Sequence, residues 1–318
     1  MQEAQGACRH IKSSLFFDYK NRAKFCPYYD EGICAENLDG LRLDIDNIEK
    51  IRKQLIEIPP ERCSKCRFFE PEEKKKNLPP IKNLYIADWH FCYVNCTYCA
   101  YPKEEDLIKA GHYDVFPFIK ELMDKKFINK KTKVIFECGD SCVHPEFDKI
   151  MFYFLNNDFE NITINTSAQR YCDSIAQGIA KGIAQVIVSF DSGCQYIYNR
   201  IKRINKFDIA VNNVKRYLAS QMPKKKNVII KYNIVQGIND NKKEPLDLFI
   251  FARDLGVNKL IFDIESDFYE RSLNHVPQHI REITAFIKDI ARYNDYDIDF
   301  APKLNELYKI AKEKNVHI

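Results

Sequence analysis

From residue 81 onward, short apolar runs rich in β-branched residues alternate with segments of helical periodicity. Six such runs lie at residues 83–89, 133–138, 161–166, 184–190, 227–235 and 259–265. The amphipathic stretches between them include residues 115–126, 146–155, 206–220 and 244–255. Runs that are apolar along their whole length are typical of parallel strands buried on both faces, and the intervening lengths suit crossover helices. The pattern predicts an α/β fold of six βα units, either a partial barrel or a wound sheet, with its site at the carboxyl ends of the strands.

The first 70 residues have a different character. They hold five of the twelve cysteines and one plausible helix, at residues 44–57. The segment PEEKKKNLPP at residues 71–80 is charged and has prolines at both ends, which predicts a linker because proline interrupts helices and central strands. We therefore expect a cysteine-rich module at 1–70, a linker at 71–80, and a barrel with C-terminal helices at 81–318.

Composition and charge narrow the class of protein. A hydrophobic fraction of 45% and a charged fraction of 30% are typical of soluble globular proteins. We find no run near the roughly 18 apolar residues of a membrane span and no signal-peptide core at the N-terminus. The net charge of +4 does not indicate a nucleic-acid partner. These features predict a cytoplasmic protein without a membrane partner, whose reduced cysteines serve metal binding or catalysis rather than disulfides.

The segment HFCYVNCTYCAYP, at residues 90–102, follows the first predicted strand directly. Its C-x3-C-x2-C spacing places Cys92, Cys96 and Cys99 on one tight loop. A tetrahedral zinc site needs four ligands, and no fourth ligand lies nearby in the sequence. Three thiolates suit a [4Fe–4S] cluster in which one iron is left for a non-protein ligand.

This loop, after the first strand of a six-unit βα barrel, resembles that of the radical S-adenosylmethionine (SAM) superfamily, including the aromatic Tyr98 before the third cysteine. The resemblance implies that the open iron of the [4Fe–4S] cluster binds SAM. It also implies that reductive cleavage of SAM gives a 5′-deoxyadenosyl radical, which abstracts hydrogen from a substrate. The electron would come from a one-electron reductant such as flavodoxin or ferredoxin.

Later motifs fall where the family has its SAM-binding turns. Cys138-Gly139-Asp140-Ser141 stands in place of a GGEP-like turn, and it keeps one glycine and one carboxylate. The alternative is that Asp140 and Ser141 only cap the next helix, and Arg203 has the alternative of a solvated helix charge. The resemblance implies SAM contacts by Tyr98, Gly139, Asp140, Ser141, Asn165, Ser189, Asp191, Arg203 and Gln236.

Four N-terminal cysteines suggest a second metal site. The set comprises Cys8, Cys26, Cys63 and Cys66. Four thiolates satisfy either zinc or an iron–sulfur cluster. Their arrangement resembles the SPASM/twitch modules that hold an auxiliary [4Fe–4S] cluster, although those modules generally follow the barrel. Cys34 is a substitute ligand for Cys8 or Cys26, and His10 is a further candidate.

Two other cysteines, Cys142 and Cys194, follow turns at predicted strand ends. An unligated cysteine is usually a small buried hydrophobe. A thiol at that place is also suited to return a hydrogen atom to a substrate radical, so we predict these two as catalytic.

Three functions remain open. The first is radical oxidation or epimerisation of a small polar, sugar-like substrate. It is favoured because neither end shows a winged-helix pattern for binding a leader peptide. The alternative is a maturase that crosslinks, oxidises or epimerises a peptide. A non-enzymatic iron–sulfur or zinc protein is disfavoured, because it would not need the polar turns at residues 139–140 and 189–193.

Overall fold

The computed structural model describes most of the chain and forms two compact units. The described residues are 6–19, 22–26, 34–35, 45–58, 63, 66, 69–71, 79–89, 91–99, 114–266, 268 and 273–313. One unit comprises residues 1–91 and 102–164, and the other comprises 92–101 and 165–318. Most of the predicted linker, residues 72–78, lies outside the described residues.

The first unit is built on a parallel sheet that begins with the predicted strands. β6 (Asn83–Ala87) pairs in parallel with β7 (Lys133–Phe136), which pairs in parallel with the start of β8 (Ile162–Thr166). Leu84, Val134 and Ile162 lie in one row across these strands and are fully buried. One face of β6 is fully buried and the other is half-buried, whereas β7 and β8 are buried along most of their length.

The N-terminal segment extends the same sheet, which the sequence did not indicate. β2 (Ser14–Asp18) pairs in parallel with β6 and is buried along its whole length. β3 (Arg22–Lys24) and β4 (Cys34–Ala35) follow as antiparallel strands. A separate two-stranded sheet joins β1 (Gly6–Cys8) to β5 (Phe69–Pro71).

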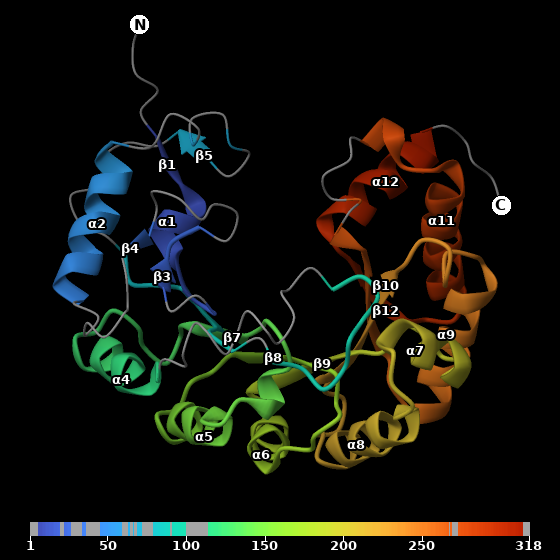
Figure 1. Cartoon of the computed structure of the whole chain (residues 1–318), viewed down its shortest axis with the longest axis horizontal. Helices are drawn as coiled ribbons and strands as arrows, with labels where there is room; N and C mark the ends of the chain where they lie inside the picture. The colour runs from blue at the N-terminus through green and yellow to red at the C-terminus, as the bar shows by residue number, and fades with distance from the viewer. Residues whose placement is uncertain are drawn as a thin grey trace, which may run out of the picture. The chain divides into compact units, whose positions relative to one another are not determined.

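Amphipathic helices cover the first unit. They are α1 (Arg9–Ser13), α2 (Ile45–Glu57), α4 (Phe116–Asp124) and α5 (Phe147–Asn156). Figure 1 shows α4 and α5 along one side of the strands. Aromatic rings join these two layers: Phe118 meets Phe17 of β2 at 5.3 Å, and Phe147 meets Phe136 of β7 at 5.1 Å, both edge to face.

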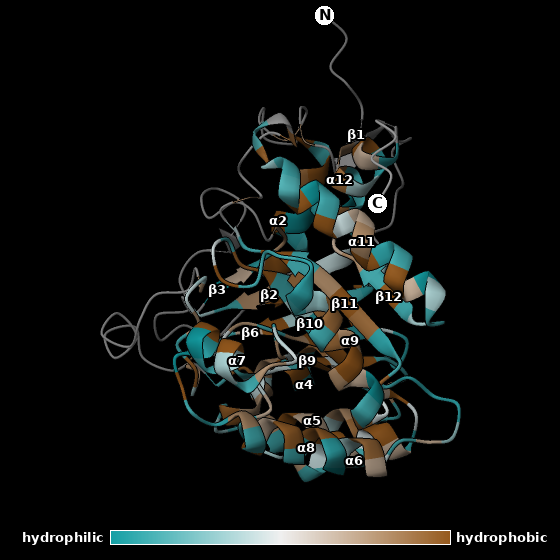
Figure 2. Ribbon diagram, turned by 90° about the vertical axis from the view of Figure 1, so that its right-hand side faces the viewer, coloured by the Kyte–Doolittle hydropathy of each residue, from teal (hydrophilic) through white to brown (hydrophobic). Residues whose placement is uncertain are grey.

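The second unit has a fully parallel sheet in the order β9-β10-β11-β12. Its strands are β9 (Ala184–Ser189), β10 (Val228–Ile234), β11 (Lys259–Ile264) and β12 (Asp297–Phe300). Its helices are α6 (Asp173–Ala180), α7 (Gln195–Lys202), α8 (Phe207–Ala219), α9 (Lys243–Leu255), α11 (Gln278–Tyr293) and α12 (Pro302–Glu313). In Figure 2 the ribbons of α8 and α11 carry both hydrophobic and hydrophilic bands, as helices with one buried face do.

The predicted α/β class, with a mostly parallel sheet, is confirmed. The six predicted strands correspond to β6 through β11, and the predicted helices correspond to α2, α4, α5, α8 and α9. β12 was not predicted. None of the described helices is long and apolar enough to cross a membrane.

Arg52 of α2 ties the N-terminal segment to the start of β6. The side chain is 2% exposed, and its Nε donates to the Ile11 carbonyl at 2.9 Å. Its Nη2 donates to the carbonyls of Lys12 and of Pro79, the latter at 2.9 Å. Burial lowers the pKa of Arg52 to about 10. The guanidinium still donates below that pH, and its loss would leave these carbonyls without a donor.

We therefore expect Arg52→Met to lower the free energy of unfolding by about 1–3 kcal/mol, measured by urea denaturation. The matched control is Lys53→Met, which removes the neighbouring exposed charge. Lys53 pairs with Glu49 at 3.1 Å on the surface, and such a pair is worth less than about 1 kcal/mol. Equal losses in the two variants would contradict this role for Arg52.

Candidate functional site

The C-x3-C-x2-C loop belongs to the second unit and rests on the end of α7. The main-chain N–H of Asn95 donates to the Lys202 carbonyl at 3.0 Å, and that of Thr97 donates to the Ile201 carbonyl at 2.9 Å. The N–H of Cys99 donates to the Cys96 carbonyl at 3.2 Å, which closes a tight turn between two of the thiols. These bonds satisfy the carbonyls that the end of a helix leaves without partners.

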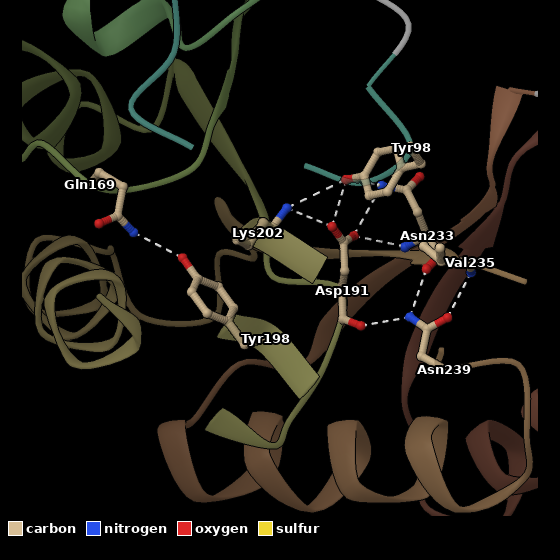
Figure 3. A network of polar contacts seen from close by, with 8 residues as sticks. All are labelled: Tyr98, Gln169, Asp191, Tyr198, Lys202, Asn233, Val235 and Asn239. Atoms are coloured by element: carbon tan, nitrogen blue, oxygen red, sulfur yellow. Dashed lines mark hydrogen bonds and ion pairs between the residues drawn. The ribbon is translucent and has the colours of Figure 1, made fainter. Parts of the chain in front are cut away.

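Tyr98 fixes this loop to a buried carboxylate (Figure 3). Its hydroxyl donates to Oδ2 of Asp191 at 2.5 Å. Nζ of Lys202 donates to the same oxygen at 2.5 Å. The other oxygen, Oδ1, accepts from the main-chain N–H of Asn233 at 2.8 Å and from its Nδ2 at 2.9 Å. Both carboxylate oxygens of Asp191 are therefore each bonded twice.

A second asparagine locks the turn on which Asp191 lies. Asp191 follows β9 with a φ of 62°, a left-handed conformation that aspartate tolerates better than most residues. Nδ2 of Asn239 donates to the main-chain carbonyl of Asp191 at 2.8 Å and to that of Asn233 at 2.9 Å. Its Oδ1 accepts from the N–H of Val235 at 2.6 Å. The turns after β9 and β10 are thus held together by amide groups (Figure 3).

The charges of this network are strongly coupled. Burial, together with the Asp191 carboxylate, raises the pKa of Tyr98 well above its ordinary value, so the phenol keeps its proton and donates. Burial acts to lower the pKa of Lys202, but the Asp191 carboxylate outweighs it and raises that pKa well above its ordinary value. Burial also raises the pKa of the Cys96 thiol, and the Lys202 ammonium opposes this shift.

Gly193 sets how closely this turn approaches α9. A Cβ at this position would lie 2.3 Å from the main-chain oxygen of Asp247. The obstacle is backbone, so it does not yield as a flexible side chain would. The glycine in the sequence Asp191-Ser192-Gly193 is thus required for packing.

In the first unit, the turn after β7 has an unusual backbone. Cys138 and Gly139 are both left-handed, with φ of 72° and 55°. The N–H of Asp140 donates to the Phe91 carbonyl at 2.9 Å. Its Oδ1 accepts from the N–H of Cys142 at 3.2 Å and caps the short 3-10 helix at Ser141–Val143. Asp140 therefore does act as a cap, and its contact with SAM stays a prediction.

A buried Asp–His pair lies beside that turn, and sequence reasoning missed its acid. Nε2 of His144 lies 3.0 Å from Oδ2 of Asp88, which directly follows β6. Nδ1 of His144 accepts the N–H of Glu146 at 2.9 Å, so the ring proton resides on Nε2 and is donated to Asp88. The signal available was an acidic residue at the end of the first strand.

Two oxygens in this part of the first unit are buried without a hydrogen-bond partner among the described residues. They are Oδ1 of Asp88 and Oγ of Ser141. Buried polar atoms are normally satisfied, so these two oxygens call for a partner from outside the described residues.

The other residues predicted to contact SAM lie in β8, at the end of β9, at the end of α7 and after β10. Ser189 ends β9, and Asn165 lies in β8. Arg203 is exposed and caps α7 in a left-handed conformation, while the Gln236 N–H donates to Oε1 of Glu265 at 3.1 Å. Their contacts with SAM stay predictions.

The predicted catalytic thiols lie in different settings. Cys142 is fully buried, whereas Cys194 is half-buried at the start of α7, where its N–H donates to Oγ of Ser192 at 2.9 Å. Their catalytic role is not tested by these positions.

Sequence reasoning also missed Lys202, because it selected the neighbouring Arg203. Lys202 is 1% exposed, and it shares the buried face of α7 with Tyr198 and Ile201. The spacing of these three residues, at i, i+3 and i+4, is the signal that places the lysine inward.

Three of the N-terminal cysteines lie near the small two-stranded sheet. Cys8 pairs with Phe69 across β1 and β5. The N–H of Cys66 donates to the Cys63 carbonyl at 3.0 Å, and that of Phe69 donates to the Cys66 carbonyl at 2.9 Å. Cys26 follows β3 and is buried, as Cys8 and Cys63 are. The ligand role of these cysteines stays a prediction, and the side chain of Cys34 lies outside the described residues.

The fold and the loop together define an α/β protein with a three-thiol loop after its first predicted strand. Residues 86–252 match the model of the radical SAM superfamily, which is more than half of the chain. The chain therefore belongs to the radical SAM superfamily. No curated protein sequence matches it.

Solved structures share the fold at low sequence identity. SuiB of Streptococcus suis bound to the precursor peptide SuiA is 14% identical, with a TM-score of 0.54 over 87% of this chain and 57% of that one. SuiB bound to S-adenosylmethionine is 13% identical, with a TM-score of 0.54 over 90% and 60%. The native enzyme anSMEcpe with bound AdoMet and the Cp18Cys peptide is 15% identical, with a TM-score of 0.50 over 69% and 63%. The chain thus spans less than two thirds of the length of these structures.

The family implies a [4Fe–4S] cluster and SAM, and the residues present fit both. The three loop cysteines Cys92, Cys96 and Cys99 would supply the three protein thiolates of the cluster. Among the described residues, no three acidic, histidine or cysteine side chains converge on one metal ion. A cluster does not need such convergence, because each thiolate binds its own iron. The unsatisfied oxygens of Asp88 and Ser141 fit a polar cofactor.

Proposed function

We propose that this chain is a radical SAM enzyme that modifies a peptide. The observation that carries the proposal is the C-x3-C-x2-C loop, whose main chain is bonded to α7 and whose Tyr98 is bonded to the buried Asp191. When bound there, a [4Fe–4S] cluster supplies the electron that cleaves SAM reductively and starts radical chemistry on the substrate. That electron comes from an external one-electron donor of the flavodoxin or ferredoxin kind.

The chain's own residues orient this chemistry. Cys92, Cys96 and Cys99 hold the cluster. Asp191 acts through Tyr98 and Lys202 rather than by touching SAM, because all its described bonding positions are occupied from within the chain. The proposed SAM contacts are Gly139, Asp140, Ser141, Asn165, Ser189, Arg203 and Gln236, together with the ring of Tyr98.

A peptide is a better-supported substrate than the sugar-like molecule that the sequence favoured. Two structures with this fold hold peptides: SuiB is bound to the precursor peptide SuiA, and anSMEcpe is bound to the Cp18Cys peptide. The structures described above offer no parallel support for a sugar. The sequence argument for a small molecule rested on a missing leader-binding pattern, which is weaker than a shared fold that accepts peptides elsewhere.

Two finer proposals accompany this function. We propose Cys194 rather than Cys142 as the thiol that returns hydrogen to a substrate radical, because Cys142 is 0% exposed.

We also propose that Cys8, Cys26, Cys63 and Cys66 bind an auxiliary [4Fe–4S] cluster in the manner of SPASM/twitch modules. Iron and zinc analysis of the anaerobic protein separates this from the zinc alternative: about eight irons per chain against about four irons and one zinc.

The cluster assignment is tested by removing one thiol. Cys96→Ala should lose more than about 100-fold of the reductive conversion of SAM to 5′-deoxyadenosine, because the cluster loses one of three protein ligands. The measurement is 5′-deoxyadenosine formed by the anaerobic, dithionite-reduced protein. The control is Cys172→Ala, which removes a buried thiol at the start of α6 that is not one of the three loop cysteines. Undiminished cleavage in Cys96→Ala would overturn the assignment.

The substrate class is tested with two pools offered to the same protein. One contains synthetic peptides encoded by short reading frames next to the gene, and the other contains nucleotide sugars and cyclitols. We expect the peptide pool to raise 5′-deoxyadenosine formation at least about tenfold over the uncoupled rate, because a positioned substrate consumes the radical productively. Mass spectrometry should then find one peptide changed in mass or stereochemistry. Stimulation by the sugar pool alone would overturn the peptide proposal and leave the radical SAM assignment intact.

A further inference from the structure

The pair formed by Lys202 and Asp191 is unusual in its burial. The two side chains are 1% and 0% exposed, and their charged atoms are 2.5 Å apart. A buried ion pair gains little stability over an apolar pair of similar size, because both charges must leave water. Stability alone therefore does not explain why this pair is buried beside the loop.

The geometry places Lys202, the positive member of the pair, next to the loop that carries Cys92, Cys96 and Cys99, which we call the cluster loop. Nζ of Lys202 lies 3.4 Å from the hydroxyl of Tyr98 and 5.7 Å from the centre of its ring. Tyr98 stands between Cys96 and Cys99 in the sequence. The main-chain carbonyl of Lys202 accepts the N–H of Asn95, so the lysine contacts the loop through both its backbone and its side chain.

Asp191, the negative member, is also bonded by neutral donors. Tyr98 and Asn233 together give the Asp191 carboxylate three hydrogen bonds besides the one from Lys202. Three hydrogen bonds to the Asp191 carboxylate thus remain when the lysine is removed.

We propose that the buried Lys202–Asp191 pair sets the reduction potential of the cluster held by the loop. Lys202 favours the uptake of one electron from the external donor, Asp191 moderates this effect, and Tyr98 holds the pair at a fixed place between two cluster ligands. The inference rests on the proposed cluster and assigns Lys202 and Asp191 as positioning and electrostatic residues, not as groups that touch substrate.

The experiment is a redox titration of the as-isolated full chain, followed by the electron paramagnetic resonance signal of the reduced cluster. Lys202→Met should lower the potential, with an equilibrium constant for reduction about tenfold smaller. This is the size that Coulomb's law gives for one unit charge removed about 12 Å away at an effective dielectric constant of about 20. The double variant Lys202→Met with Asp191→Asn removes both charges and should return most of the way to the wild-type potential. Lys202→Arg should keep the potential close to that of the wild type.

The control is Lys206→Met. Lys206 is exposed and lies over the ring of Tyr93 at 5.8 Å, so it also neighbours the loop, but water and salt screen its charge. We expect no shift from it.

A purely structural role for the pair makes a different prediction. The reduction potential of the double variant would then be shifted as far as that of Lys202→Met, or further, and that result would overturn the inference. An unchanged potential in Lys202→Met, with the cluster and SAM cleavage intact, would also overturn it while leaving the proposed function standing. A wild-type protein that binds no cluster on reconstitution with iron and sulfide would overturn both.

Discussion

The carboxylate of Asp191 is the group on which the organisation of the second unit's site depends. It accepts four hydrogen bonds from three residues, which come from the cluster loop, the end of α7 and the end of β10. A buried carboxylate is costly unless it is fully bonded, so these elements are constrained to meet at this point. The cluster loop has no regular secondary structure of its own in the described residues. Its conformation follows from what Tyr98, Asn95 and Thr97 bond to.

The first unit also has a turn that is held in place by hydrogen bonds of buried polar groups. There the turn after β7 bends through two left-handed residues, and hydrogen bonds from Asp140 to the Phe91 carbonyl and from His144 to Asp88 fasten it to the chain that leaves β6. In each unit, a strand end that carries predicted cofactor contacts is held by buried polar groups. Such groups tolerate few alternative arrangements, because each unsatisfied bond would cost about 1–3 kcal/mol.

The sequence predicted most of the parallel sheet, because strands β6 through β11 are rich in apolar, β-branched residues and are separated by helical lengths. It missed β2, a short strand inside a segment dominated by cysteines, and β12, whose sequence Asp297–Phe300 alternates acidic and apolar residues. The cluster loop could be predicted because its three cysteines have a specific spacing. Lys202, Asn233 and Asn239 could not, because a lysine or asparagine has no local pattern that distinguishes a buried network from a solvated surface. The contacts that bury these three residues join parts of the chain up to 135 positions apart.

The central claim is that the chain itself holds the cluster loop in place, before any cluster binds. Amide hydrogen exchange of the cluster-free protein tests it at the N–H groups of Asn95 and Thr97, which donate to the end of α7. In the wild type these amides should exchange at least about tenfold more slowly than unbonded amides of a mobile loop. In Asp191→Ala they should exchange rapidly, while the amides of β11 and those of β10 other than Asn233, which donates to Asp191 itself, stay protected. Rapid exchange at Asn95 and Thr97 in the wild type, or equal protection in both proteins, would contradict the account.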